Sequence, residues 1–323
     1  MHFRPTTAFI LRFTSLSFAI SFLMFCAVPL QAQNSEILSK AQAEAQSGMI
    51  IFPKDKSVVE MTLQELRHYY PSELRRLEFS PNQDELNGLL GKIGERVQSF
   101  FRDFSNTSSR EFVLLHDVGN DRKINRRFNY LISYHLNDNR PLLQEYRTDD
   151  KNRPIDQRAT KGFFITSGYV GFSLNFHPSY QQASRFRLVG KQAADPRAYI
   201  IAFAQKTETN VLQIEYTDII TGKSTHVPVQ GLAWVDPDTY QILRFRINLL
   251  NEANQSPMTE QSTDIKLSEA LFEDKQKKSW LPREVVVATK IGRRIFRSQH
   301  RYADYKAFDV TSDFKLDPPK ARN

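Results

Sequence analysis

The spacing of apolar residues changes about a third of the way along the chain. Between Ser35 and about Phe104, apolar residues recur at three- and four-residue steps, the period of an amphipathic helix. From Glu111 onward, short runs rich in β-branched and aromatic residues follow one another, separated by turn-forming residues, as is typical of strands. We therefore expect an N-terminal helical segment (33–109), a β domain (110–314) and a flexible polar tail (315–323).

The clearest helical pattern covers residues 84–104. It places one apolar stripe along the helix, formed by Leu86, Leu89, Leu90, Ile93, Val97, Phe100, Phe101 and Phe104. Asp84 is the predicted N-cap, and the stripe needs a partner surface. Weaker helices are predicted at Ser35–Ser47 and at Thr62–Tyr69, which Pro71 ends. The short apolar run Met49–Phe52 fits a strand or a buried linker.

Twelve short runs in the second region have the composition of strands. They are Glu111–Val118, Asn125–Leu136, Pro141–Arg147, Gly162–Phe176, Ser184–Val189, Arg197–Ala204, Val211–Ile219, His226–Trp234, Gln241–Leu250, Thr263–Leu271, Arg283–Ile291 and Ile295–Phe308. No helical pattern lies between them, so we expect antiparallel pairing. The predicted fold class is α+β, a strongly curved antiparallel sheet or half-open barrel of roughly 9 to 12 strands on which the N-terminal helical segment packs.

The last predicted hairpin has two different faces. Because side chains alternate along a strand, Phe296, Ser298, His300 and Tyr302 share one face, and Arg297, Gln299 and Arg301 share the other. The first face is expected to be the more apolar one, and the second to be cationic and in water.

The first 32 residues have the parts of a secretory signal peptide. Arg4 and Arg12 precede an apolar run, Phe13–Leu30, and the small residue Ala32 precedes a polar stretch. We expect export to the periplasm or to the outside of the cell, with cleavage after Ala32. Two alternatives remain: an uncleaved membrane anchor, because the run approaches the roughly 18 residues of a spanning helix, and lipidation at Cys26, which the large residue before it argues against.

Composition and charge narrow the possible chemistry. The chain has 40% hydrophobic and 25% charged residues, only 12 Gly and one Cys, an ordinary globular composition. Cleavage after Ala32 would remove that Cys together with two arginines, so the net charge of +8 would fall to +6. A mature chain without Cys forms no disulfide and uses no thiolate as a nucleophile or metal ligand.

No catalytic, metal-binding or phosphate-binding motif is present in the sequence. We therefore predict no catalytic residue, no metal, no cofactor and no enzymatic activity. His300 could serve as a pH sensor, but a histidine at the edge of the core is the simpler interpretation. Asp236 and Asp238 could form a carboxylate pair, but an Asp-Pro-Asp sequence between two strands is first of all a turn.

Positive charge gathers on the last hairpin, at Arg293, Arg294, Arg297 and Arg301. Two interpretations are open: a strand face in solvent, or a surface attracted to anionic membranes. Nucleic-acid binding is not expected, because no nucleic-acid-binding module is recognisable.

The segment 231–246, GLAWVDPDTYQILRFR, resembles the G-x-x-W-V/I-D-P-x-T-x-x-I-x-R strand-turn-strand of the bacterial lipoprotein-carrier (LolA/LolB-like) superfamily. Segments 281–287 and 302–305 also look like late strands of such proteins. The resemblance implies a curved antiparallel sheet over helices, with an apolar concave face that shelters acyl chains. Trp234 and Arg244 match the motif, and about 75 residues of helical sequence before the first confident strand are a departure from it.

Three functions follow from these observations. The first is an exported, non-catalytic envelope protein that binds a lipid or another hydrophobic ligand, such as a lipoprotein acyl chain, through Trp234, Arg244, Phe296 and Tyr302. The second is a structural or interaction module that contacts an envelope protein, with the sheet closed on its own core. A filled interior would favour the second. The third is a hydrolase with dispersed residues, which a His beside a carboxylate and a Ser would support.

Overall fold

In the computed structural model, all the described residues belong to one compact unit, which lies within residues 41–323. The structure describes residues 48–53, 56–104, 106–137, 140–155, 168–193, 196–209, 212, 214–217, 224–250, 258–272 and 277–308. The predicted signal peptide, the helix predicted at Ser35–Ser47 and the C-terminal tail lie outside these residues, so those predictions and the proposed domain limits stay predictions.

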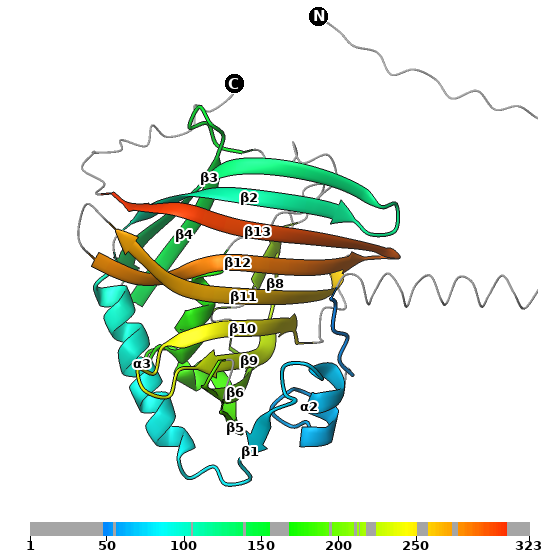
Figure 1. The fold of residues 1–323 in the computed structure, drawn as a ribbon, viewed down its shortest axis with the longest axis vertical. Coiled ribbons are helices and arrows are strands. Elements are labelled where there is room, and N and C mark those ends of the chain that lie inside the picture. Colours follow the sequence, from blue (N-terminus) through cyan, green and yellow to red (C-terminus); the bar gives the residue numbers. More distant parts are fainter. Residues whose placement is uncertain are drawn as a thin grey trace, which may run out of the picture. The chain divides into compact units, whose positions relative to one another are not determined.

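Eleven strands form one antiparallel sheet in the order β1-β5-β6-β9-β10-β11-β12-β13-β2-β3-β4, with two free edges (Figure 1). The strands are β1 (Leu77–Phe79), β2 (Thr107–Asp117), β3 (Arg122–Asn137), β4 (Arg140–Thr148), β5 (Ser184–Gln192), β6 (Ala198–Gln205), β9 (Val229–Val235), β10 (Ile242–Leu249), β11 (Met258–Phe272), β12 (Lys277–Ile291) and β13 (Arg294–Ala307). The predicted curved, unclosed antiparallel sheet is confirmed.

Two expected strands differ from the prediction. Within Gly162–Phe176, residues Gly171–Phe176 form a 3-10 helix, η2. The backbone N–H groups of residues 168–170 bond to the carboxylate of Glu145 instead of to a neighbouring strand. His226–Trp234 is divided at Pro228, because proline has no N–H to donate. The part before it, β8 (Ser224–Val227), pairs with β7 (Ile214–Thr217) in a separate two-stranded sheet.

Two α-helices precede β2, as the sequence predicted. Helix α2 (Leu63–Tyr69) begins at Thr62, whose side chain forms a capping box with Glu65. Helix α3 (Leu86–Arg102) carries the apolar stripe, but its N-cap is Glu85 and not the predicted Asp84. The Asp84 carboxylate accepts from the Asn82 amide at 2.6 Å, and the side chain of Glu85 forms no cap bond.

The sheet has two covered faces. We call the face that packs against α3 and η2 the inner face; it carries Leu188, Ile201, Phe203, Ala233 and Phe245. The opposite, outer face is covered on β5, β6 and β9 by residues 52–53 and 56–77, including α2 (Figure 1). On β13, β2 and β3 the outer face is not covered by any element of the described residues. The sheet is therefore covered on both faces at the β5–β9 end and on its inner face alone at β13, β2 and β3.

The last hairpin has the two faces that the alternation predicts. Phe296, Ser298, His300 and Tyr302 are buried on the inner face, whereas Arg301 is exposed and Arg297 is half-buried. The buried face is not purely apolar, however, because His300 lies in a network of polar and charged side chains. Among the described residues, no helix has the length and apolar character that a membrane crossing requires.

Candidate functional site

Helix α3 and the inner face of the sheet enclose a narrow apolar slot. Its lining residues are Val97, Phe100, Tyr169, Val170, Ile242, Phe245, Leu267 and Trp280, with Arg96, Ser173 and Gln241 as the polar members. Its volume of about 20 Å³ is enough for one or two water molecules. An apolar lining with a few polar groups is the pattern of a site for an amphiphile, but the slot is closed to one in this conformation.

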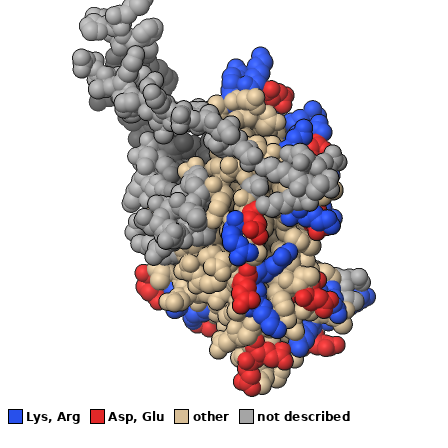
Figure 2. Space-filling view, turned by 90° about the vertical axis from the view of Figure 1, so that its left-hand side faces the viewer, with Lys and Arg blue, Asp and Glu red and all other residues tan. Residues whose placement is uncertain are grey.

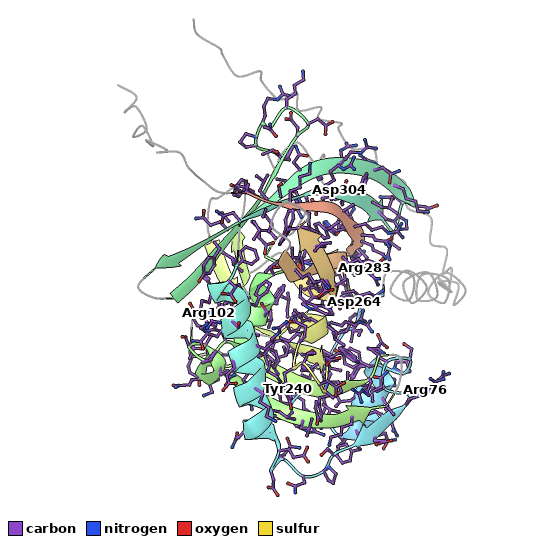
Figure 3. The ribbon with its side chains drawn as sticks, turned by 60° about the vertical axis from the view of Figure 1, so that its left-hand side comes forward. Arg76, Arg102, Tyr240, Asp264, Arg283 and Asp304 are labelled. Carbon is purple, nitrogen blue, oxygen red and sulfur yellow. The ribbon has the colours of Figure 1, made fainter. Side chains whose placement is uncertain are left out.

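Few polar bonds hold α3 against the sheet side of this slot. Lys92 Nζ lies 2.9 Å from the hydroxyl of Tyr240, and Arg96 Nε lies 3.2 Å from the amide oxygen of Gln241. Figure 3 shows Tyr240 beside α3 and Arg102 at its C-terminal end, and basic and acidic side chains alternate over this side of the molecule in Figure 2. The helix is held to the sheet mainly by apolar contacts.

On its other side, α3 packs closely against the segment that contains η2. The Gln181 amide donates to the backbone carbonyls of Leu90 and Phe176, at 2.8 Å in each case. A Cβ atom at Gly94 would lie 2.8 Å from that same amide and 3.3 Å from the carbonyl oxygen of Phe176, so the Gln181 side chain would have to shift. Gly94 therefore sets the distance between α3 and this segment.

A hydrogen-bonded network around a buried ion pair lies on the inner face where β13, β2, β3 and β4 meet. Arg147 binds both carboxylate oxygens of Glu111, with Nη2 at 2.7 Å from Oε1. The same carboxylate accepts from His300 Nδ1 at 2.8 Å and from the Tyr302 hydroxyl at 2.9 Å. The Glu111 side chain is fully buried, and that of Arg147 is 8% exposed. A buried carboxylate with four donors is a fixed anchor for these strands.

Burial and pairing act in opposite directions on the pKa values of this network. Burial raises the pKa of Glu111, but the guanidinium of Arg147 and the bonds from Arg147 and His300 outweigh it and hold the pKa well below its usual range. Burial lowers the pKa of His300, although the nearby carboxylate raises it in part. The network therefore holds an ionised Glu111 beside a neutral His300 at neutral pH.

A second buried carboxylate, Glu145 on β4, fastens the segment that forms one wall of the slot. It accepts backbone N–H groups from Gly168, Tyr169 and Val170 at 2.6, 3.0 and 3.0 Å, and the hydroxyl of Tyr130 also donates to it. Burial raises the pKa of Glu145, against the effect of these bonds. Glu145 thus gives the Tyr169 wall a fixed position.

Ser298, His300 and Glu111 have the order of a serine–histidine–carboxylate triad. Ser298 Oγ lies 2.9 Å from His300 Nε2, and the other ring nitrogen faces Glu111. This is the combination that the hydrolase hypothesis requires. However, Ser298 is only 5% exposed and His300 is fully buried, and neither lines the slot or any groove described below. Strand β13 is also paired on both sides, so its N–H groups are not free to stabilise an oxyanion.

The residues predicted to bind a ligand do not gather at one place. Trp234 and Arg244 lie together on the outer face, with the guanidinium 4.9 Å from the indole ring. Arg244 also binds Asp264 at 2.7 Å, and the chain itself buries Trp234. Phe296 and Tyr302 are on the inner face, where Tyr302 serves the network around Glu111. None of the four lines the slot, and their role in ligand binding stays a prediction.

The four basic residues of the last hairpin have different environments. Arg294 binds the buried carboxylate of Asp117 at 2.5 Å and lies over the Phe296 ring. Arg293 is exposed at the hairpin turn, and Arg297 and Arg301 lie on the outer face.

The predicted turn at Asp236 is also present: its carboxylate accepts from the backbone N–H and the hydroxyl of Thr239, at 2.7 and 2.9 Å.

Sequence reasoning missed Glu111, Arg147 and Glu145. A weak signal for Glu111 was available, because it occupies the same side of its strand as Val113 and Leu115, which are buried. Within the ranges that the structure describes, no group of three or more His, Cys, Asp or Glu side chains is arranged to hold a metal ion.

Comparisons with known proteins concern the fold. No family model and no curated protein sequence matches the chain. Its structure is similar to that of a DUF1329 family protein from Desulfovibrio piger, with 13% identity, a TM-score of 0.40, and 71% of this chain and 95% of that chain covered. It is also similar to a putative outer membrane lipoprotein-sorting protein domain from Vibrio parahaemolyticus (10% identity, TM-score 0.38, 71% and 96% covered). A LolA superfamily protein from Nitrosomonas europaea is a third similar structure (10% identity, TM-score 0.30, 68% and 94% covered).

Proposed function

We propose that this chain is an exported, non-catalytic envelope protein that binds an acyl chain or a similar hydrophobic ligand between α3 and the inner face of the sheet. The observation that carries the proposal is the apolar slot with its polar members Arg96, Ser173 and Gln241. The signal-peptide pattern of residues 1–32 supports export, and N-terminal sequencing of the exported protein tests it: the mature chain is expected to begin at Gln33.

The energetics allow such binding without a dedicated polar site. Each buried methylene contributes about 0.8 kcal/mol, so ten methylenes give about 8 kcal/mol, which corresponds to a Kd near micromolar. Because the slot is closed, part of this energy is spent on moving α3 away from the sheet. The contacts that α3 loses are apolar, and an acyl chain in the slot replaces them with contacts of the same kind.

A crosslink between α3 and the sheet tests this mechanism. In a Cys26→Ser background, Lys92→Cys and Tyr240→Cys are joined by a short bis-maleimide, and the binding of a fluorescent fatty acid is measured before and after joining. The matched control joins Lys56→Cys to Glu65→Cys, because these residues also form a direct contact, at 2.7 Å, but lie away from the slot. We expect the first crosslink to weaken binding at least ten-fold and the control to leave it unchanged.

The filled interior specifically favours the second candidate, a protein-interaction module closed on its own core. Native mass spectrometry of the gently purified protein separates the two. A co-purifying lipid, displaced by added fatty acid, supports ligand binding. No bound lipid, together with no fluorescent fatty acid binding by the uncrosslinked protein, refutes ligand binding and leaves the interaction module.

A further inference from the structure

The uncovered part of the outer face carries a row of cationic and aromatic side chains. Arg301 on β13, Phe112 on β2 and Arg127 on β3 are direct neighbours across the three strands. Phe112 is 38% exposed, and the Arg127 guanidinium lies 5.3 Å from its ring centre. The row lies in a groove of about 600 Å³ that Leu114, Asn125, Gln299 and Asp150 also line.

Three arginines on this part of the outer face form no ion pair with a carboxylate of the described residues. Arg127, Arg297 and Arg301 form no ion pair there, whereas nearby Arg110 is paired with Asp304. The carboxylate nearest in register to Arg301 is that of Glu284. It is bound by Lys266 at 2.9 Å and by the Gln299 amide at 2.6 Å. The bond from Lys266 and, to a smaller extent, the charge of Arg301 lower the pKa of Glu284, but Arg301 and Glu284 form no ion pair.

The covered part of the same face shows the opposite arrangement. Arg244 and Arg246 on β10 lie beneath the N-terminal segment, and Asp264 and Glu73 surround both guanidinium groups. Where the chain covers its outer face, it therefore supplies the anions itself. Where the face is open, Asp304 and Asp121 pair with Arg110 and Lys123, but Arg127, Arg297 and Arg301 form no ion pair with any described residue.

We propose that the outer face of β13, β2 and β3 binds the surface of an anionic phospholipid membrane. Arg127 and Arg301 are on strands roughly 10 Å apart, with the Phe112 ring between them. This spacing suits several separate phosphates better than one. The arginines bind lipid phosphates and Phe112 enters the headgroup layer. The site lies on the face opposite the slot and does not depend on the proposed ligand there.

The test measures binding to vesicles with the chain in the form that the producing cell exports. Vesicles of phosphatidylcholine alone serve as the baseline, and vesicles with added phosphatidylglycerol provide the anionic surface. We expect binding to require phosphatidylglycerol and to weaken as salt is raised. Each arginine near an anionic surface contributes roughly five-fold to the partition constant, so Arg127→Gln, Arg297→Gln and Arg301→Gln together lower it roughly a hundred-fold.

Two matched controls show whether the loss of binding comes from this surface, from the change in net charge, or from the loss of any exposed apolar side chain. The triple variant Arg102→Gln, Arg185→Gln and Lys278→Gln removes the same charge from exposed positions elsewhere and is expected to retain most binding. Phe112→Ser is expected to weaken binding, and Phe79→Ser, which alters another exposed phenylalanine, is not. Circular dichroism and urea unfolding show whether each variant is folded.

Several results overturn the proposal. Equal losses in the two triple variants would mean that net charge alone attracts the membrane. Absence of any dependence on phosphatidylglycerol would exclude the anionic surface. Saturable binding of inorganic phosphate that blocks vesicle binding at constant ionic strength would assign the groove to a soluble anion.

Discussion

Replacing Arg147 by methionine tests the buried network most directly. The substitution keeps much of the side-chain volume but leaves the Glu111 carboxylate, fully buried, without its bidentate partner. Removing one partner of a buried ion pair costs about 3–5 kcal/mol, because the remaining charge is not compensated. The hydrogen bonds from His300 and Tyr302 remain, so we place the expected loss in the free energy of unfolding near the lower limit, about 3 kcal/mol.

Urea unfolding, monitored by circular dichroism, measures this loss. Two further variants test whether the uncompensated buried charge causes it. Lys278→Met removes an exposed ion pair with Glu269 in the same sheet and is expected to cost at most about 1 kcal/mol. Adding Glu111→Gln to Arg147→Met removes both charges and is expected to recover part of the stability. If Arg147→Met costs no more than Lys278→Met, the assignment of a buried, uncompensated charge is wrong.

Three further predictions concern pH and close packing. The pKa of His300 is lower in the folded state than in the unfolded state, near 6.5, so protonation favours unfolding. The contribution of His300 to the free energy of unfolding is therefore complete above the unfolded pKa and is lost as pH falls toward the folded pKa. His300→Gln is expected to flatten this part of a plot of unfolding free energy against pH; an unchanged slope contradicts the assignment. Gly94→Ala is expected to lower the melting temperature because of the Gln181 contact, whereas Gly91→Ala, with open space around it, raises it. Similar shifts in both would refute the close packing. Gly231→Ala places a Cβ 2.1 Å from the Arg246 carbonyl and is expected to destabilise β9–β10 strongly, and a melting temperature within a few degrees of the parent would contradict this.

Alternation of side chains was sufficient to predict most of the sheet, because a strand with one buried face leaves a period-two pattern. The last hairpin is an example: the residues that share a side from Phe296 to Tyr302 are all buried. The pattern was not sufficient at Gly162–Phe176, where an aromatic run looks like a strand. A carboxylate elsewhere in the chain binds the N–H groups of residues 168–170, and a sequence read locally does not contain that partner.

The buried network was hidden from sequence reasoning for a related reason. Glu111 and His300 are 189 positions apart in the chain, and their 2.8 Å contact depends on β13 pairing with β2. Arg147 reaches Glu111 across β3, which separates the two strands. Strand order brings these residues together, and the pattern within one strand contains no information about that order.

The inner face is covered by the Tyr169 wall and by α3, and different contacts hold these two parts in place. The Tyr169 wall is held by three N–H bonds to the buried carboxylate of Glu145, and its Tyr169 hydroxyl also lies 3.3 Å from His300. Helix α3 has no such anchor on the sheet side of the slot, where its polar bonds come from the exposed side chains of Lys92 and Arg96. The Lys92 bond is exposed and exchanges with water at little cost, whereas breaking the bonds to Glu145 removes three donors from one desolvated carboxylate. If the proposed ligand enters the slot, we expect α3 to move, with loss of the Gln181–Leu90 bond, and the Tyr169 wall to stay in place.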